Sequence, residues 1–340
     1  MRNRSRRLAP LLLAALLAIL PGRAWAWGAS GHRLIGLLAI ESLPAEIPGF
    51  LRGSEAAAMI AELGREADRS KGAGRTHDAE RDPGHYMNLD DDAKVAGKLA
   101  LDALPPTREE YDTLLRQAGS DQYKAGYLYY AIIDGWQQLV EDFAHWRVDA
   151  AGEKRAARRG DRLWFARDRQ LRELLTIRDL GYWSHFVGDG SQPMHVSIHY
   201  NGWGPFPNPA GYATASTLHA YFEGDFVRRW VSLGDMRAAL APYRDCGCGI
   251  AARTAAYLRA TQAQVVPLYA LEKQGAFRGG DRRGEDFAAA RLAAGAAELR
   301  DIIVDAWRQS LDAKVGYPPV AVRDVLSGKV NPIGPLLGLD

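Results

Sequence analysis

The chain has 340 residues, two cysteines and nearly balanced charge, with 43 basic and 41 acidic residues. Two cysteines exclude a disulfide-dense scaffold, and the small net charge excludes a global electrostatic argument for nucleic acid binding. The length is sufficient for one domain with a large hydrophobic core.

A secretory signal peptide is predicted at the N-terminus. Four arginines within the first seven residues precede an apolar run from Leu8 to Leu20, which is too short to span a bilayer securely. Ala24-Trp25-Ala26 has the small-x-small pattern of a cleavage site, so we expect the mature chain to begin at Trp27. Removal of the five leader arginines leaves 38 basic and 41 acidic residues. We therefore expect a secreted or periplasmic protein that has no stable membrane insertion once residues 1–26 are removed.

Helical patterns dominate the mature chain. Pro105-Pro106-Thr107 predicts the start of a helix that ends near Gln117. From Tyr123 to Phe143, aromatic and apolar residues recur at three- and four-residue steps, which predicts one buried stripe on a long helix. The remaining helices are predicted at 33–42, 54–67, about 168–189, about 215–230, about 249–270 and 286–311. Strand patterns are scarce.

Several segments have no clear helical pattern. Residues 153–169 are rich in arginine and form either an insertion or a helix with a solvated face. Residues 198–214 are rich in glycine, proline and aromatic residues and are predicted to be irregular; part of this loop is compatible with contacts to bases or to a lipid head group. Cys246 and Cys248 are either two thiols or one local bridge. We expect one all-α domain over 27–312 and an irregular tail over 313–340.

Histidines and carboxylates occur at the spacing of metal ligands. His185 and Asp189 are four residues apart on a predicted helix, so their side chains leave the same face. His219 and Glu223 repeat this spacing on a later helix, and His195 lies just past the end of the first. Nitrogen and carboxylate ligands of this kind suit zinc. Each pair alone is more often a cap or a surface interaction, but their combination favours a metal site.

The N-terminal part of the mature chain adds further candidate ligands. The free amine of Trp27, beside its own carbonyl, can chelate a metal, and His32 adds a third ligand. Asp68 closes a predicted helix, and His85 lies in Gly84-His85-Tyr86-Met87-Asn88. His77, His145 and His199 have no partner at a useful spacing, so we expect them to be ordinary histidines.

Taken in order, these residues resemble a known superfamily of trinuclear-zinc enzymes. It comprises the single-strand nucleases of the S-one/P-one type and the bacterial zinc-dependent phospholipases C. The resemblance implies a single-domain, multi-helix fold with a trinuclear zinc cleft, and it runs from Trp27 to about Leu311. It rests on Trp27…His32, Ala67-Asp68, His85-Tyr86, His185-x-x-Gly188-Asp189-x-x-Gln192-Pro193-Met194-His195 and Leu218-His219-x-x-x-Glu223.

The resemblance also implies a role for each residue and three Zn²⁺ ions as cofactors. The implied ligand sets are Asp68, His85, His185 and Asp189 for one zinc; the Trp27 amine and carbonyl, His32 and the bridging Asp189 for another; and His195, His219 and Glu223 for a more exposed one. A zinc-activated hydroxide would attack the phosphodiester, with Asp68 orienting the water. Lys71 would steady a phosphate oxygen; the alternative is that Lys71 is simply solvated.

The two branches of the superfamily share this zinc cage. The spacing from Trp27 to His32 and the aromatic Tyr86 after the zinc histidine resemble the nucleases. There, Tyr86 would stack on a base and Asn88 would hydrogen-bond its edge. Glu223, where the nucleases typically have Asp, resembles the phospholipases.

We therefore expect a secreted zinc-dependent endonuclease acting on single-stranded DNA and RNA, with 3′-nucleotidase activity left open. Two residues resemble the phospholipases instead, namely Glu223 and the Met194 of Gln192-Pro193-Met194-His195. The alternatives are a zinc-dependent phospholipase C acting on phospholipid head groups and a non-catalytic, secreted zinc-binding protein. The partner implied is a nucleic acid or nucleotide substrate, and no protein partner is implied.

Overall fold

Helices account for almost all of the regular secondary structure. A computed structural model describes residues 27–337, in which helix makes up 66% and strand 4%. The predicted helical class is confirmed at this level. The predicted signal peptide lies outside the described residues. Within them, no helix has the length and apolar character needed to cross a membrane.

The regular elements follow one another closely along the chain. The α-helices are α1 (Ala29–Glu41), α2 (Ser54–Leu63), α3 (Glu66–Arg69), α4 (Arg75–Arg81), α5 (Arg108–Gln117), α6 (Gln122–Ala125), α7 (Leu128–Arg155), α8 (Arg159–Asp189), α9 (Thr217–Ala220), α10 (Val227–Trp230), α11 (Leu233–Ala239), α12 (Ile250–Gln262), α13 (Val265–Lys273), α14 (Arg282–Gln309), α15 (Val322–Leu326) and α16 (Ile333–Leu337). Two antiparallel pairs of short strands are β1 (Lys94–Val95) with β2 (Leu99–Ala100), and β3 (Lys314–Val315) with β4 (Val320–Ala321). Shorter helical turns are η1 (Gly49–Leu51), η2 (Asp82–His85), η3 (Leu101–Ala103), η4 (Pro193–His195), η5 (Tyr221–Phe226, a π-helix) and η6 (Ser310–Asp312).

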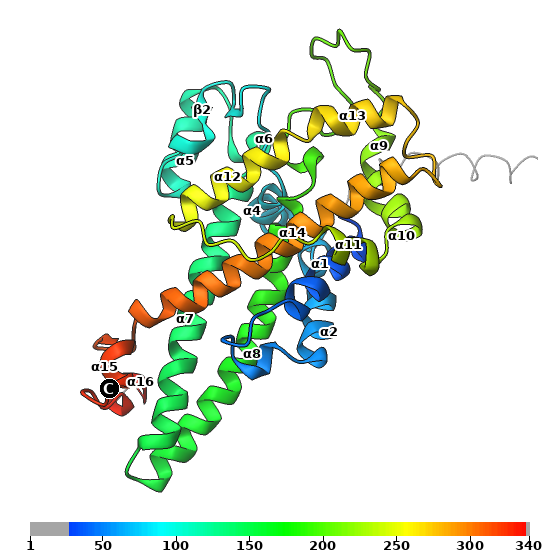
Figure 1. Cartoon of the computed structure of the whole chain (residues 1–340). Coiled ribbons are helices and arrows are strands. Elements are labelled where there is room, and N and C mark those ends of the chain that lie inside the picture. Colours follow the sequence, from blue (N-terminus) through cyan, green and yellow to red (C-terminus); the bar gives the residue numbers. More distant parts are fainter. Residues whose placement is uncertain (1–26, 338–340) are drawn as a thin grey trace, which may run out of the picture.

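A long antiparallel hairpin of α7 and α8 is the frame of the molecule (Figure 1). Helix α14 crosses this hairpin, and α1 and α2 pack against α8. The far ends of α7 and α8 project beyond the other long helices (Figure 1). Apolar residues of α14 that were predicted to share a face are fully buried, including Leu292, Leu299 and Ile303. The main core therefore lies where α14, α1 and the near half of the hairpin meet.

The C-terminal tail is more regular than predicted. It forms the β3–β4 pair, α15 and α16, and α15 packs against α7. Valines of the tail join small residues of α7 in a second apolar cluster, made of Ala144, Val148, Ala151, Val315, Val322 and Val325. The prediction of an irregular tail was wrong because this cluster gives the tail a local core.

Several helix boundaries also differ from the prediction. Tyr123 is not on the long helix: it lies on α6, is 63% exposed, and is separated from α7 by Gly126 with φ of +76°. Glycine adopts this left-handed backbone readily, so it ends one helix before the next begins. The arginine-rich segment 153–169 forms the end of α7, a short connection and the first turns of α8, which starts at Arg159 rather than near 168.

Other predicted helices are present with changes in detail. Thr107 and Glu110 form a reciprocal capping box at the start of α5, as the Pro-Pro-Thr signal predicts. The helix predicted at 249–270 is two helices, α12 and α13. The helix predicted at 215–230 consists of α9, the π-helix η5 and α10.

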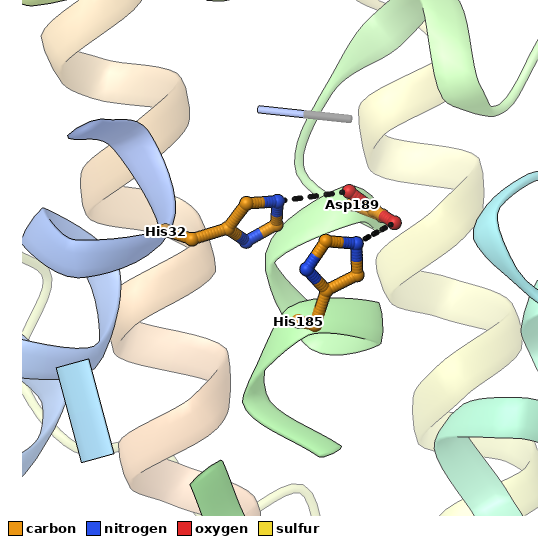
Figure 2. Close-up of side chains that lie close together, drawn as sticks. All are labelled: His32, His185 and Asp189. Atoms are coloured by element: carbon orange, nitrogen blue, oxygen red, sulfur yellow. Dashed lines mark ion pairs between the residues drawn. The ribbon is translucent and has the colours of Figure 1, made fainter. Parts of the chain in front are cut away.

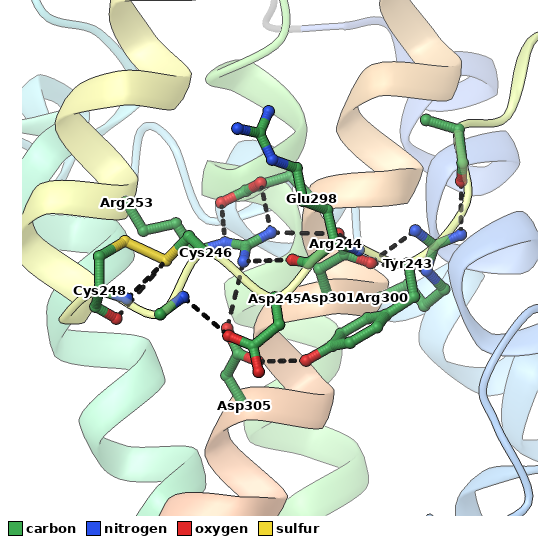
Figure 3. Close-up of polar contacts among 12 residues, drawn as sticks. Tyr243, Arg244, Asp245, Cys246, Cys248, Arg253, Glu298, Arg300, Asp301 and Asp305 are labelled. Carbon is green, nitrogen blue, oxygen red and sulfur yellow. Dashed lines mark hydrogen bonds and ion pairs between the residues drawn. A yellow bond between two sulfur atoms is a disulfide. The ribbon is translucent and has the colours of Figure 1, made fainter.

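A buried arginine joins α12 to α14 (Figure 3). Arg253 is 8% exposed and contacts three carboxylates of α14, those of Glu298, Asp301 and Asp305. Its guanidinium also donates to the carbonyl of Arg244, at 2.9 Å. Cys246 and Cys248 form a disulfide in the segment between α11 and α12 (Figure 3). Of the two alternatives for these cysteines, the structure therefore shows the local bridge.

Candidate metal centre

The side chains predicted as metal ligands converge from seven separate elements. α1 supplies His32, α3 supplies Asp68, and the end of η2 supplies His85. The C-terminal turns of α8 supply both His185 and Asp189. The remaining three come from η4, α9 and η5, namely His195, His219 and Glu223. All of these side chains are buried.

The ligand-type atoms form three overlapping groups. The first group is His32, His185 and Asp189; the second is Asp68, His85 and His185; the third is His195, His219 and Glu223. Within each group the candidate atoms lie within 4.8 Å of one another. Ligands about 2.1 Å from a tetrahedral ion stand roughly 3.4 Å apart, so modest adjustment would place each set around a metal. Each group can hold a metal ion, and His185 is shared by two.

Asp189 lies where the first two groups meet, and Figure 2 shows it between side chains of α1 and α8. Its Oδ1 is 3.5 Å from His32 Nε2. Its Oδ2 is 3.3 Å from His185 Nε2 and 3.2 Å from His85 Nδ1. Burial alone would raise the pKa of this carboxyl, but the nearby His185 and His195 hold the pKa well below its usual range. The ionised carboxylate thus offers one oxygen to each of two neighbouring groups.

Backbone carbonyls fix the orientation of two histidine rings. His185 Nδ1 is 2.8 Å from the carbonyl oxygen of Gly64, and His195 Nδ1 is 2.6 Å from the carbonyl oxygen of His85. A carbonyl oxygen only accepts, so Nδ1 must carry the proton in both rings. With Nδ1 held by a carbonyl, Nε2 of each ring faces a carboxylate of the site, and this is the orientation that metal-binding histidines adopt.

Unpartnered buried atoms test whether these residues fit a metal. Both ring nitrogens of His32 and of His219 are buried without a hydrogen-bond partner. The same holds for His195 Nε2, Asp189 Oδ1 and Glu223 Oε1. Buried polar atoms are costly when unpaired, and an accumulation of them in one place needs an explanation. Coordination of cations would provide one, so the residue set fits metal binding.

The third group depends on the π-helix η5, which carries Glu223. Burial alone would raise the pKa of Glu223, but His219 and His195 lower it below its usual value. Gln192 Nε2 donates to the Glu223 carboxylate at 3.3 Å, while Gln192 Oε1 accepts from the backbone of Met194. The fully buried Gln192 therefore orients the carboxylate of the third group. π-Helical turns are frequent at functional sites.

The segment before α1 is tied to both sides of this centre. The indole of Trp27 is fully buried and donates to Ser191 Oγ at 2.9 Å. The backbone N–H of Gly28 donates to the carbonyl oxygen of Glu223 at 3.0 Å. A Cβ at Gly28 would lie only 3.0 Å from that oxygen, so a side chain there would force the two segments apart. The Trp27 side chain is a core residue, and only its backbone is left for the predicted role as a ligand.

A pocket of about 850 Å³ opens over the second and third groups. Asp68, His85, His195 and His219 lie in its wall, whereas the fully buried His185 and Asp189 lie behind it. Its remaining lining residues are Arg69, Lys71, Gly72, Asp78, Asp82, Tyr86, Asn88, Tyr123, Lys124, Met194, Tyr200 and Asn201.

The predicted substrate-contacting residues line this pocket, but they also have partners within the chain. Lys71 Nζ is 2.6 Å from Asp68 Oδ1 and its side chain is 23% exposed, so Lys71 is not a solvated surface lysine. The hydroxyl of Tyr86 donates to the carbonyl oxygen of Tyr123. Asn88 donates to the carbonyl oxygen of Lys124 at 2.8 Å, which leaves its Oδ1 without a partner.

Sequence reasoning missed several residues of the site. Tyr200, which lines the pocket, was not singled out, and Asn201 beside it belongs to the loop whose contacts were left open between bases and a lipid head group. In the same loop Trp203 is buried and stacks on His199, so it belongs to the core. Ser191 lies in the motif after Asp189, but its partner is 164 residues away, so no local signal reveals the contact.

The three remaining histidines, which were predicted to be ordinary, lie outside the three groups of candidate ligands. His199 is enclosed by Trp203 and Asp91, and His77 faces Asp78. His145 is half-buried on α7.

Comparisons with known proteins add no further constraint. Neither a protein-family model, nor a curated protein, nor a solved structure matches the chain. Any assignment of function therefore depends on the chemistry of the site.

Proposed function

We propose that the protein is a secreted or periplasmic, zinc-dependent phosphodiesterase that hydrolyses single-stranded DNA and RNA. The observation that carries the proposal is the set of three overlapping groups of buried histidines and carboxylates at the base of a pocket. A metal centre of this kind, open to a cavity on one side, suits hydrolysis of a charged ester.

The donor set favours zinc and favours catalysis over a structural role. Every side-chain donor is a histidine nitrogen or a carboxylate oxygen, which suits zinc. Structural zinc sites are typically closed by four protein ligands and often contain cysteine, whereas the third group offers three side chains beside the pocket. Bound zinc would supply positive charge for the phosphodiester and a water that ionises near neutral pH.

In this proposal the ligands are distributed as the resemblance implies. Asp68, His85, His185 and Asp189 would hold one zinc; the backbone of Trp27, His32 and Asp189 another; and His195, His219 and Glu223 the third. The two differently directed oxygens of Asp189 support its assignment as the bridge.

The other pocket residues would bind and orient the substrate. Lys71 holds the carboxylate of Asp68 at 2.6 Å, so it can orient Asp68 and present positive charge to a phosphate oxygen. Asp68 would accept a proton of the attacking water. Tyr86 and Asn88 both line the pocket, so the ring of Tyr86 would stack on a base and the amide of Asn88 would hydrogen-bond the base edge.

Single strands suit this geometry better than duplexes. A phosphate must reach ligand groups that are nearly inaccessible, while its base contacts the outer wall of the pocket. Bases of a single strand are free to stack on aromatic side chains, whereas paired bases are held in the duplex.

A parallel assay tests the proposal. Protein recovered after export and loaded with zinc is incubated with single-stranded DNA and, separately, with phosphatidylcholine vesicles. We expect cleavage of the DNA, its loss with a chelator and its return with zinc. Cleavage of the lipid alone would identify a phospholipase C. No cleavage of either substrate by fully zinc-loaded protein would favour the non-catalytic alternative.

A further inference from the structure

The far half of α8 exposes four leucines. The exposed fractions are 61% for Leu163, 53% for Leu171, 60% for Leu174 and 47% for Leu175. None of these side chains belongs to either of the two apolar core clusters. Single exposed leucines are common on protein surfaces, but four on one helix form a patch that calls for a partner.

These leucines share one face of the helix with two arginines. At about 100° per residue, they fall with Arg167 and Arg178 in an arc of roughly 120°. Phe165, on the opposite side of α8, is fully buried. We call the exposed leucines and arginines of this arc the α8 face: Leu163, Arg167, Leu171, Leu174, Leu175 and Arg178. The arc also contains the half-buried Trp164.

The tail covers one side of the hairpin but leaves the α8 face bare. Valines of the tail pack against the α7 residues Ala144, Val148 and Ala151. The α8 face begins in the first turns of α8, in the projecting part of the hairpin (Figure 1). It ends at Arg178, which lines a pocket together with Gln309 at the end of α14. We call the projecting part of the α7–α8 hairpin the arm. The leucines of the α8 face are therefore exposed on this arm, where a flat surface could contact them.

The same arm carries an excess of positive charge. Residues 153–179 contain nine basic and five acidic residues, whereas the net charge of the whole chain is only +2. Some of these basic residues are neutralised locally: Arg172 pairs with Asp142, and Arg178 of the α8 face pairs with Asp179. Arg158, Arg159 and Arg167 are exposed, and no acidic side chain of the described residues lies within ion-pair distance of them.

We propose that the α8 face docks the protein on an anionic lipid bilayer. Helix α8 would lie along the surface, with its leucines at the boundary of the acyl chains and its arginines against lipid phosphates. A basic, leucine-bearing helix face has the composition of interfacial helices. A second copy is a poorer partner, because a symmetric contact would bring the arginines of two identical faces together.

The test compares vesicles that differ only in charge. Protein recovered after export, with its N-terminus verified by mass spectrometry, is sedimented with phosphatidylglycerol vesicles and with phosphatidylcholine vesicles. Two variants each remove one component of the α8 face and its surroundings: Leu163→Gln with Leu171→Gln and Leu174→Gln, and Arg158→Gln with Arg159→Gln and Arg167→Gln. Two control variants each replace a pair of exposed residues elsewhere: Met59→Gln with Val266→Gln, and Lys98→Gln with Arg278→Gln.

We expect binding to phosphatidylglycerol that weakens at least about tenfold in both α8 variants and is unchanged in the controls. The replaced side chains are exposed, so the circular dichroism and melting temperature of each variant should match those of the parent. If the parent and the α8 variants bound phosphatidylglycerol vesicles equally well, the proposal would be overturned. A parent protein that does not bind these vesicles would also overturn it. A dimer that the leucine variant converts to a monomer would identify a second copy instead. Loss of single-stranded DNA binding in the arginine variant, with vesicle binding intact, would identify a nucleic acid.

Discussion

Replacement of Arg253 by methionine should strongly destabilise the fold without touching the metal centre. Arg253 makes five hydrogen bonds: two to Glu298 at 2.9 and 3.0 Å, one each to Asp301 and Asp305 at 3.1 and 3.2 Å, and one to the carbonyl of Arg244. Methionine preserves much of the packing of the aliphatic stem but removes every donor and the charge. The carboxylates of α14 would then remain beside α12 without their shared cation.

The expected loss follows from what each carboxylate retains. Asp301 still accepts from Arg300 at 2.7 Å, and Asp305 still accepts from the hydroxyl of Tyr243 at 2.9 Å. Glu298 loses both of its bonds to Arg253. Removing one partner from a buried ion pair lowers the free energy of unfolding by about 3–5 kcal/mol. Because two of the three carboxylates keep another donor, we expect a loss at the lower end of this range, about 3 kcal/mol. The exposed pair of Arg237 and Glu41 provides the control, because Arg237→Met should cost less than about 1 kcal/mol.

The dependence on pH separates this explanation from a simple loss of packing. Burial raises the pKa of Glu298, and Arg253 opposes that rise. A carboxyl whose pKa is raised in the folded state binds protons on folding. The free energy of unfolding therefore falls as the pH rises above the pKa that the carboxyl has in the unfolded chain. Without Arg253 the pKa of Glu298 rises further, and this fall extends to higher pH. The deficit of Arg253→Met should therefore be small in acid and larger near neutrality.

Urea unfolding of zinc-loaded protein, followed by circular dichroism, measures this deficit at about pH 5 and about pH 8. The parent, Arg253→Met and Arg237→Met are compared at both values. A deficit that is equal at the two values, or larger in acid, would refute the assigned role of Glu298.

Three shorter predictions concern the candidate metal centre. Asp189→Asn should remove two zinc ions per chain in elemental analysis, because both oxygens of Asp189 are assigned as ligands; loss of one ion would contradict the bridge. Ser191→Ala should weaken zinc binding about tenfold in competition with a chelator, since Trp27 loses its hydrogen-bond acceptor, whereas Ser191→Thr should restore it. Unchanged affinity in the alanine variant would show that Ser191 does not position Trp27. Tyr86→Ser should raise KM for single-stranded DNA about tenfold with little change in kcat, because one stacking contact is lost; an unchanged KM would remove Tyr86 from the substrate site.

Much of the candidate metal centre could be predicted because part of its geometry is local. Two side chains four residues apart on a helix leave the same face, so the pairing of His185 with Asp189 follows from spacing alone. The π-helix could not be anticipated in this way. His219 and Glu223 have the same spacing as the pair on α8, and no residue pattern distinguished the wider turn that carries Glu223.

Helix ends were predictable where a residue type determines the backbone, and less so where charge obscured the pattern. The cap at Thr107 was recognisable because its side chain satisfies the first turn of α5. The first turns of α8 contain several arginines, which weaken the apolar periodicity, so the predicted start was nine residues too late. The same arginines mark the arm on which the leucines of α8 remain exposed. Helical spacing places Leu163 and Leu171 on one face, but it cannot decide whether that face is covered.

Contacts between residues far apart in the sequence leave no local pattern from which they could be predicted. At this site such contacts determine how the three groups overlap. His185 belongs to two groups because His32 and His85 approach it from different elements. The indole of Trp27 reaches Ser191 across 164 residues. Both contacts converge on the C-terminal end of α8, where Asp189 faces the first two groups and Gln192 orients Glu223 of the third. A small displacement of this one helix end would alter all three groups together, so we infer that the packing that fixes α8 also fixes the spacing of the candidate ligands.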